Sequence, residues 1–289
     1  MRIDIELLRI ISALGIVWFH SGNLSGREIA YGGLIFFVII SSYLATISRR
    51  KHSSLNRFQR LIIPGIIWSI LYGLLNLLAV GKICPQSNNF ISSILSTPST
   101  HLWYLPYMYI VLITLDRIKM MFSKTFIGLV SGTVAIALLL LSPIWRTIEL
   151  MSPFELYTHA FPAVLIGIYL GCHEHIAAKL RLSILSGIIV SILLMVFISV
   201  EGMGIPYFFG FTPCLLLLRS DIFQGYKLDI TPISSLTFGV YLIHWLFLLI
   251  LWKLGFTGYI LPIIVFPLSL LCIFTLKKIL PKHLFQYVA

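Results

Sequence analysis

The sequence predicts an all-α polytopic membrane protein of about ten transmembrane helices, with both termini in the cytoplasm. The chain has 289 residues, of which 58% are hydrophobic and only 11% are charged, and its mean hydropathy is +0.98. Soluble domains carry about 25% charged residues, so this chain lacks the polar surface that a water-soluble globule needs. The composition excludes a secreted disulfide scaffold, a disordered chain and a soluble dinucleotide-binding enzyme.

Ten apolar runs are long enough to cross a bilayer, which needs about 20 residues per helix. Proline interrupts several runs, and membrane helices tolerate proline where neighbouring groups satisfy the freed backbone. No repeat or long polar stretch separates the runs, so we expect residues 1–289 to form one transmembrane domain. The runs fall at residues 7–23, 31–48, 61–80, 102–116, 125–143, 156–172, 184–200, 203–218, 233–252 and 259–276.

Basic residues are distributed unevenly over the expected loops. With the N-terminus in the cytoplasm, all but four of the 21 Lys and Arg residues fall on the cytoplasmic side. This is the asymmetry that membrane insertion imposes on loops. The net charge of +11 therefore marks a cytoplasmic face against the bilayer, and we expect no nucleic-acid partner. The four exceptions are Arg27, Lys82, Arg146 and Lys253.

Arg9 and His20 are the residues of the first run that indicate chemistry, because such side chains are costly in a membrane and usually mark a functional path. They are eleven positions apart, close to three helical turns, which puts them on one face about 16 Å apart along the axis. We expect both to face one continuous crevice. In the alternative interpretation, Arg9 reaches the lipid headgroups and His20 bonds a neighbouring helix.

The same two residues carry a resemblance to a known family. An arginine followed, after ten intervening residues, by a histidine is the first motif of the acyltransferase-3 family of integral membrane O-acyltransferases. Four further segments resemble the family's motifs in the family's order: the second span with its Phe-Phe pair, the Arg-x-x-Arg start of the third span, His-Leu-Trp-Tyr-Leu, and Ser-x-x-Phe-Gly-x-Tyr-x-x-His. They lie at residues 33–44, 57–64, 101–106 and 235–244.

The resemblance implies transfer of an acyl group, most often acetyl, from cytoplasmic acyl-CoA to a hydroxyl of a cell-envelope glycan or lipid-linked sugar. It implies a bacterial inner-membrane protein that uses acetyl-CoA as donor substrate, and His20 as the general base. Histidine has a suitable intrinsic pKa for taking the proton of the acceptor hydroxyl. Arg9 would hold the donor or orient the site. We expect this chain to lack the SGNH-type domain that some family members carry.

Arg57 and Arg60 begin the third apolar run. Three positions apart on a helix, they present two planar guanidinium groups to one side, and such groups suit the phosphates of coenzyme A. In the family this motif is associated with donor binding, so we assign both residues to the acyl-CoA site. The alternative is a loop that sets the topology and contacts lipid headgroups.

Two further clusters are candidates for binding the acceptor. His101 and Trp103 begin the fourth run, where they suit stacking on a sugar ring and equally suit the aromatic belt of a membrane interface. Tyr241 and His244 share one face of the ninth run. They either reach the site or bond a neighbouring helix.

Metal binding is not predicted. The segment Cys-His-Glu-His at 172–175 lacks the spacing of a helical zinc site and falls in an expected cytoplasmic turn. The other function class is a transporter or flippase for a glycan or lipid intermediate. All ten acidic residues lie at span ends or in loops, whereas ion-coupled carriers commonly use an intramembrane carboxylate.

Overall fold

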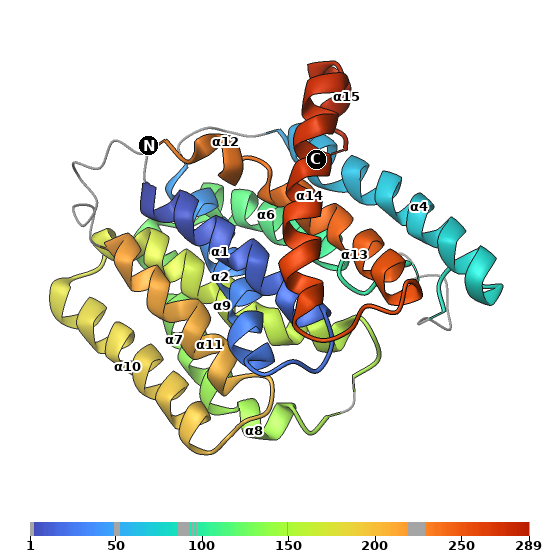
Figure 1. The fold of residues 1–289 in the computed structure, drawn as a ribbon. Coiled ribbons are helices and arrows are strands. Elements are labelled where there is room, and N and C mark those ends of the chain that lie inside the picture. The colour runs from blue at the N-terminus through green and yellow to red at the C-terminus, as the bar shows by residue number, and fades with distance from the viewer. Residues whose placement is uncertain are drawn as a thin grey trace. The chain divides into compact units, whose positions relative to one another are not determined.

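The computed structural model describes residues 3–48, 53–85, 93, 95, 97–148, 150–218 and 229–288, and it places no strand among them. Three short segments adopt other helical forms: the π-helical η1 (Phe58–Ile62) and the 3₁₀-helical η2 (His173–His175) and η3 (Thr212–Leu218). The helices (Figure 1) are α1 (Ile3–His20), α2 (Arg27–Ile47), α3 (Ser54–Arg57), α4 (Ile63–Val80), α6 (Tyr104–Met121), α7 (Lys124–Leu140), α8 (Ser142–Trp145), α9 (Phe154–Cys172), α10 (Ala178–Phe197), α11 (Gly204–Phe211), α12 (Thr231–Ser234), α13 (Thr237–Lys253), α14 (Ile260–Ile279) and α15 (Lys282–Phe285).

The all-helical class is confirmed, and each of the ten apolar runs coincides with helix. Within the described residues, four helical segments are long and apolar enough to cross a membrane: Arg27–Ile47, Ser54–Val80, Ala178–Phe197 and Ile260–Ile279. The chain is therefore a helical membrane protein. The total of about ten crossings and the cytoplasmic placement of both termini stay predictions.

The chain divides into two compact units. Unit 1 comprises residues 1–40 and 192–285, and unit 2 comprises residues 41–191 together with 286–288. The division cuts through α2 and α10, so each of these helices contributes one part to each unit. The expectation of a single transmembrane domain stays a prediction.

Unit 1 is built around α1, which packs against α13 and α14, while α13 and α14 pack against each other (Figure 1). The core of this packing is aliphatic and includes Val17, Val240 and Leu248, none of which is exposed. Trp245 and Trp252 of α13 lie against it with their rings edge to face, 5.7 Å apart. These contacts fix the end of α1 that carries His20.

Two glycines allow α1 and α2 to approach closely inside unit 1. A Cβ at Gly33 would lie 2.6 Å from the carbonyl oxygen of Ser12, and a Cβ at Gly15 would lie 2.8 Å from that of Ala30. Both distances are too short for any side chain. Small residues at helix crossings are typical of membrane bundles, where close van der Waals packing replaces the hydrophobic effect.

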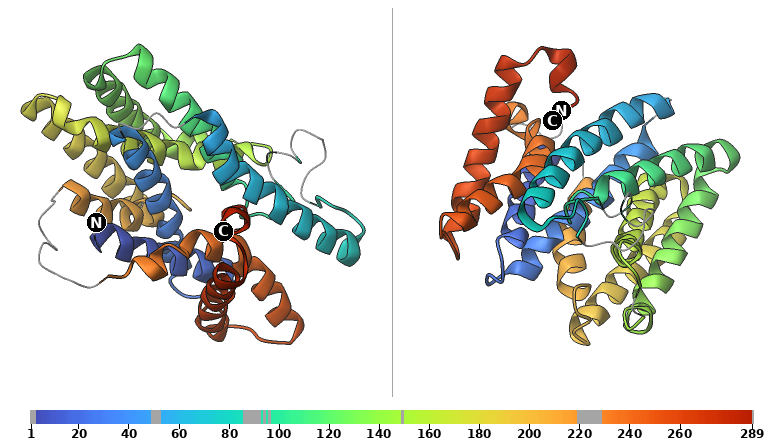
Figure 2. Two further views of the ribbon diagram at one scale, coloured as in Figure 1. Left: turned by 90° about the horizontal axis from the view of Figure 1, so that it is seen from above. Right: turned by 90° about the vertical axis from the view of Figure 1, so that its right-hand side faces the viewer.

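Unit 2 has α7 and α9 side by side (Figure 2). Gly132 of α7 lies against Tyr169 of α9, whose hydroxyl donates to the carbonyl of Arg181 at 2.6 Å. The ammonium group of Lys119 donates to the carbonyls of Ala45 and Ser48, at 2.8 and 3.0 Å. A cation on the last carbonyls of a helix stabilises its C-terminus, so Lys119 fastens α6 to the end of α2.

Candidate active site

His20 is the last residue of α1, and its ring lies against α13. The imidazole centroid is 5.4 Å from that of His244 and 5.5 Å from the ring of Trp245, which it meets edge to face. His20 itself is partly exposed, whereas His244 is fully buried. The structure therefore brings two of the predicted residues together, the histidines of the first and last motifs, although they are 224 positions apart in the chain.

His244 is oriented by its own helix. Its Nδ1 lies 2.8 Å from the carbonyl oxygen of Tyr241. A carbonyl only accepts, so Nδ1 carries the proton and donates, and in the neutral ring Nε2 is then the acceptor nitrogen. Tyr241 is nearly buried, and its ring centroid is 6.3 Å from that of His244. The predicted polar face of the ninth run is thus turned into unit 1.

Arg9 has an acidic partner. One guanidinium nitrogen lies 3.3 Å from Glu6 Oε2, and Ser234 of α12 donates its hydroxyl to the same carboxylate oxygen. The side chain of Arg9 keeps 34% of its surface exposed. It can therefore meet a second anion while it remains paired with Glu6.

The stripe of α1 between Arg9 and His20 is packed. Ser12 and Ile16 lie on this stripe, and both are buried. These two side chains are therefore packed against the rest of the chain. The single crevice expected from the sequence stays a prediction, and Arg9 and His20 lie at opposite ends of one rigid helix.

Arg27, expected only as a loop cation, makes specific contacts at the junction of α1 and α2. Its guanidinium lies over the ring of Phe19, 4.5 Å from the centroid, donates to the Phe19 carbonyl at 3.3 Å and bonds Asn23 at 3.2 Å. It therefore lies against Phe19, the residue that precedes His20 in α1. Arg27 follows His20 by seven residues, across a short glycine-containing turn. This spacing is the sequence feature that could have indicated that Arg27 lies near the end of α1.

Arg57 is engaged in a two-point ion pair. Its Nε lies 2.7 Å from one oxygen of Asp116 and its Nη2 lies 2.9 Å from the other, which fastens α3 to α6. The side chain of Arg57 is only 10% exposed. The Nε and Nη2 atoms of Arg57 are therefore engaged by Asp116 inside unit 2.

Arg60 is exposed and lies within the π-helical turn. Proline explains this turn, because Pro64 has no N–H for the carbonyl of Arg60, which would accept from position 64 in a regular α-helix. The Ile63 N–H bonds the carbonyl of Phe58, five residues back. The Arg-x-x-Arg motif is thus not on a regular α-helix, and the structure separates the two arginines into a paired one and an exposed one.

His101 and Trp103 are buried in unit 2. His101 Nδ1 bonds the hydroxyl of Ser99 at 2.8 Å, and its ring meets Tyr72 edge to face. Trp103 packs in an aromatic cluster with Tyr107 and Tyr157. Both rings are less than 5% exposed, so here they support the packing of unit 2, and their contact with an acceptor stays a prediction.

The eight predicted residues thus divide between the units. Unit 1 holds Arg9, His20, Tyr241 and His244, and unit 2 holds Arg57, Arg60, His101 and Trp103. Among the described residues, no three His, Cys, Asp or Glu side chains are grouped so that they could hold a metal ion.

Comparison with known proteins agrees with the resemblance in the motifs. The family model described as an acyltransferase domain matches residues 2–277, which is nearly the whole chain and includes all five motifs. No curated protein matches the chain, and no solved structure matches it. Because the match spans both units, the chain belongs to the acyltransferase-3 family.

Proposed function

We propose that this protein transfers an acyl group, most simply acetyl, from cytoplasmic acyl-CoA to a hydroxyl of a cell-envelope glycan or lipid-linked sugar, with His20 as the general base. The observation that carries the proposal is the partly exposed imidazole of His20 at the end of α1, in contact with His244 and Trp245, with the Arg27 guanidinium over the neighbouring Phe19 ring. An imidazole that keeps some exposed surface can reach an acceptor hydroxyl and take its proton.

With these groups, every bond and every proton of the acyl transfer can be accounted for. His20 takes the proton of the acceptor hydroxyl as its oxygen forms a bond to the thioester carbonyl carbon. The carbonyl oxygen becomes negatively charged, and the positive charge of Arg27 favours that state. The carbon–sulfur bond then breaks, and the coenzyme A thiolate leaves and takes the proton from the His20 imidazolium. The products are an ester and free coenzyme A.

The exposed arginine of the Arg-x-x-Arg motif, in unit 2, is assigned to the donor. Arg60 is proposed to contact the phosphates of acyl-CoA, because an exposed guanidinium can bind a phosphate through two parallel hydrogen bonds. Arg57 supports this site indirectly by fastening the Arg60 segment to Asp116. Arg9, in unit 1, is proposed to orient the active site, as the resemblance implies. Acceptor contacts are proposed for Tyr241 and His244 in unit 1, and separately for His101 and Trp103 in unit 2. The protein is proposed to lie in a bacterial inner membrane.

The test uses membranes that contain the protein, radiolabelled acetyl-CoA and the glycan fraction of the same cells. The wild type should move label into the glycan, and His20→Ala should not. His175→Ala is the matched control, because His175 is an exposed histidine in the turn after α9. Equal incorporation by the wild type and His20→Ala would remove His20 from the mechanism.

The donor assignment is tested on the same preparation. Arg60→Ala should raise the acetyl-CoA concentration needed for half-maximal rate and leave the maximal rate nearly unchanged, since it removes a binding contact remote from the bond that breaks. An unchanged acetyl-CoA requirement would show that Arg60 does not bind the donor.

A further inference from the structure

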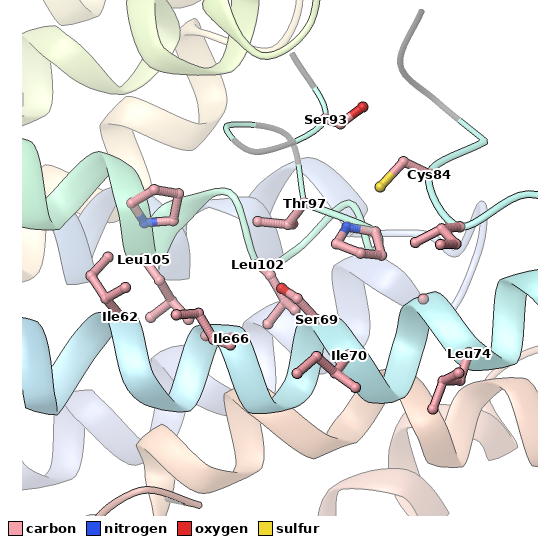
Figure 3. Close-up of a pocket in the computed structure, with 15 residues that line it drawn as sticks. Ile62, Ile66, Ser69, Ile70, Leu74, Cys84, Ser93, Thr97, Leu102 and Leu105 are labelled. Atoms are coloured by element: carbon pink, nitrogen blue, oxygen red, sulfur yellow. The ribbon is translucent and has the colours of Figure 1, made fainter. Parts of the chain in front are cut away.

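A cavity of about 530 Å³ lies along α4 within unit 2 (Figure 3). One side is α4 itself, and the other is formed by Ile83, Cys84, Ser93, Thr97, Pro98, Leu102, Leu105 and Pro106. Its size is that of a small-molecule site. Neither the donor nor the general-base assignment uses it. Its lining residues on α4 are Gly65, Ile66, Ser69, Ile70, Gly73 and Leu74, and Ile62 at the end of η1 precedes them.

The cavity is a narrow slot with a floor of small residues. Gly65, Ser69 and Gly73 are four positions apart, so they form one stripe on α4, and a second stripe of branched side chains runs beside it. A Cβ at Gly65 would lie 3.1 Å from the side chain of Leu105 on the opposite wall. A Cβ at Gly73 would lie 2.9 Å from the side chain of Ile83. Both ends of the slot are therefore close-fitting.

The opposite wall is held in place by hydrogen bonds. The side-chain amide of Asn76 donates to the carbonyls of Ile83 and Pro98, at 3.2 and 2.7 Å, and so ties both to α4. Thr97 adopts a positive φ of 62°, and its hydroxyl donates to the carbonyl of Ser99. A non-glycine residue holds such a backbone only where its surroundings fix it. The backbone that forms the slot is thus held in place by contacts within the fold.

The slot is lined mainly by apolar side chains. Cys84 lies toward the Leu74 end and Thr97 above the middle near Ser69, whereas Ile62 and Leu105 lie at the other end (Figure 3). Its rim on α4 consists of Ile66, Ile70 and Leu74, each about half exposed on a helix that is long and apolar enough to cross a membrane. A slot with this rim opens toward lipid and not toward water.

We propose that this slot binds a hydrocarbon chain of a bilayer phospholipid. The apolar walls accept a chain, and the half-exposed rim on α4 admits the chain from the bilayer. This proposal does not depend on acyl transfer, because the slot contains none of the residues assigned to the reaction.

The test is photo-crosslinking in purified, nanodisc-embedded protein with a phospholipid whose straight chain carries a diazirine, followed by peptide mapping. Crosslinks should concentrate on residues 62–74 and 97–106. Ser69→Phe fills the middle of the slot and should lower this labelling at least tenfold. Leu78→Phe is the matched control, because Leu78 is 84% exposed on the same helix and does not line the slot; its labelling should stay at the wild-type level.

A second readout protects the test against misfolding of the Ser69 variant. In protein that keeps Cys84 as its single cysteine, unlabelled straight-chain phospholipid should slow alkylation of the thiol by a water-soluble maleimide. Crosslinks spread evenly around α4, with equal labelling of both Phe variants, would overturn the proposal and show ordinary boundary lipid. Competition by a polyprenyl phosphate but not by straight-chain phospholipid would also overturn it, in favour of a branched occupant.

Discussion

The ion pair between Arg57 and Asp116 gives the sharpest test of how unit 2 is held together. The sequence motif assigns Arg57 to the donor, yet the structure uses its guanidinium edge on a carboxylate of α6. If this contact is primarily structural, removing either partner should lower the stability of the protein before it changes donor binding.

The expected coupling free energy between Arg57 and Asp116 follows from how exposed the two side chains are. Exposed ion pairs contribute about 0.2–1 kcal/mol, and breaking a buried pair costs about 3–5 kcal/mol. The two side chains are 10% and 31% exposed, so this pair lies between those limits. We expect a coupling free energy of about 2 kcal/mol, which is roughly a 30-fold change in the unfolding equilibrium.

The assay is a double-mutant cycle with Arg57→Ala, Asp116→Ala and the double variant, with unfolding followed by circular dichroism in mixed micelles of increasing SDS content. The double variant should be nearly as stable as either single variant. Arg60→Ala should unfold like the wild type. Additive losses, with a coupling below about 0.5 kcal/mol, would show that the pair is not a structural tie and would return Arg57 to the donor site.

Three other changes have defined outcomes. His244→Gln should lower the maximal acetyl-transfer rate about tenfold, the equivalent of 1.4 kcal/mol, because it removes the imidazole beside His20. The acetyl-CoA requirement should stay unchanged. Steady-state kinetics would show an unchanged rate if His244 only packs. Gly33→Val should destabilise the protein by about 2–3 kcal/mol in SDS titrations, since its Cβ would lie 2.6 Å from the Ser12 carbonyl oxygen. If the variant were as stable as the wild type, α1 and α2 could separate without a cost in free energy. Lys119→Met should cost about 1 kcal/mol in the same titration by uncapping the end of α2, and no loss would assign those carbonyls to other partners.

Much of the architecture was predictable because hydropathy alone determines where membrane helices form. The apolar run at 125–143 coincides with α7, and the run at 259–276 coincides with α14. The face shared by Arg9 and His20 also follows from helical periodicity. The family motifs added His244 as a candidate, and the structure places its ring beside that of His20.

The pairing of charged side chains was not predictable, because it depends on contacts between residues far apart in the chain. Nothing in the periodicity of either helix places Asp116 opposite Arg57, 59 positions away. The π-helical turn at Arg60 requires reading Pro64 as a missing hydrogen-bond donor, not merely as an interruption of an apolar run. Arg27 was counted only for topology, and its cation–π contact with Phe19 depends on how α1 ends and α2 begins.

The decisive measurement for the enzymatic proposal is the single-turnover rate of acetyl transfer by purified His20→Gln protein, with acetyl-CoA binding measured separately on the same sample. If His20 is the general base, the rate of transfer should fall by at least about 100-fold, while the dissociation constant for acetyl-CoA stays within a factor of two or so of the wild-type value. A transfer rate within about threefold of wild type would show that the acceptor's proton leaves by another route.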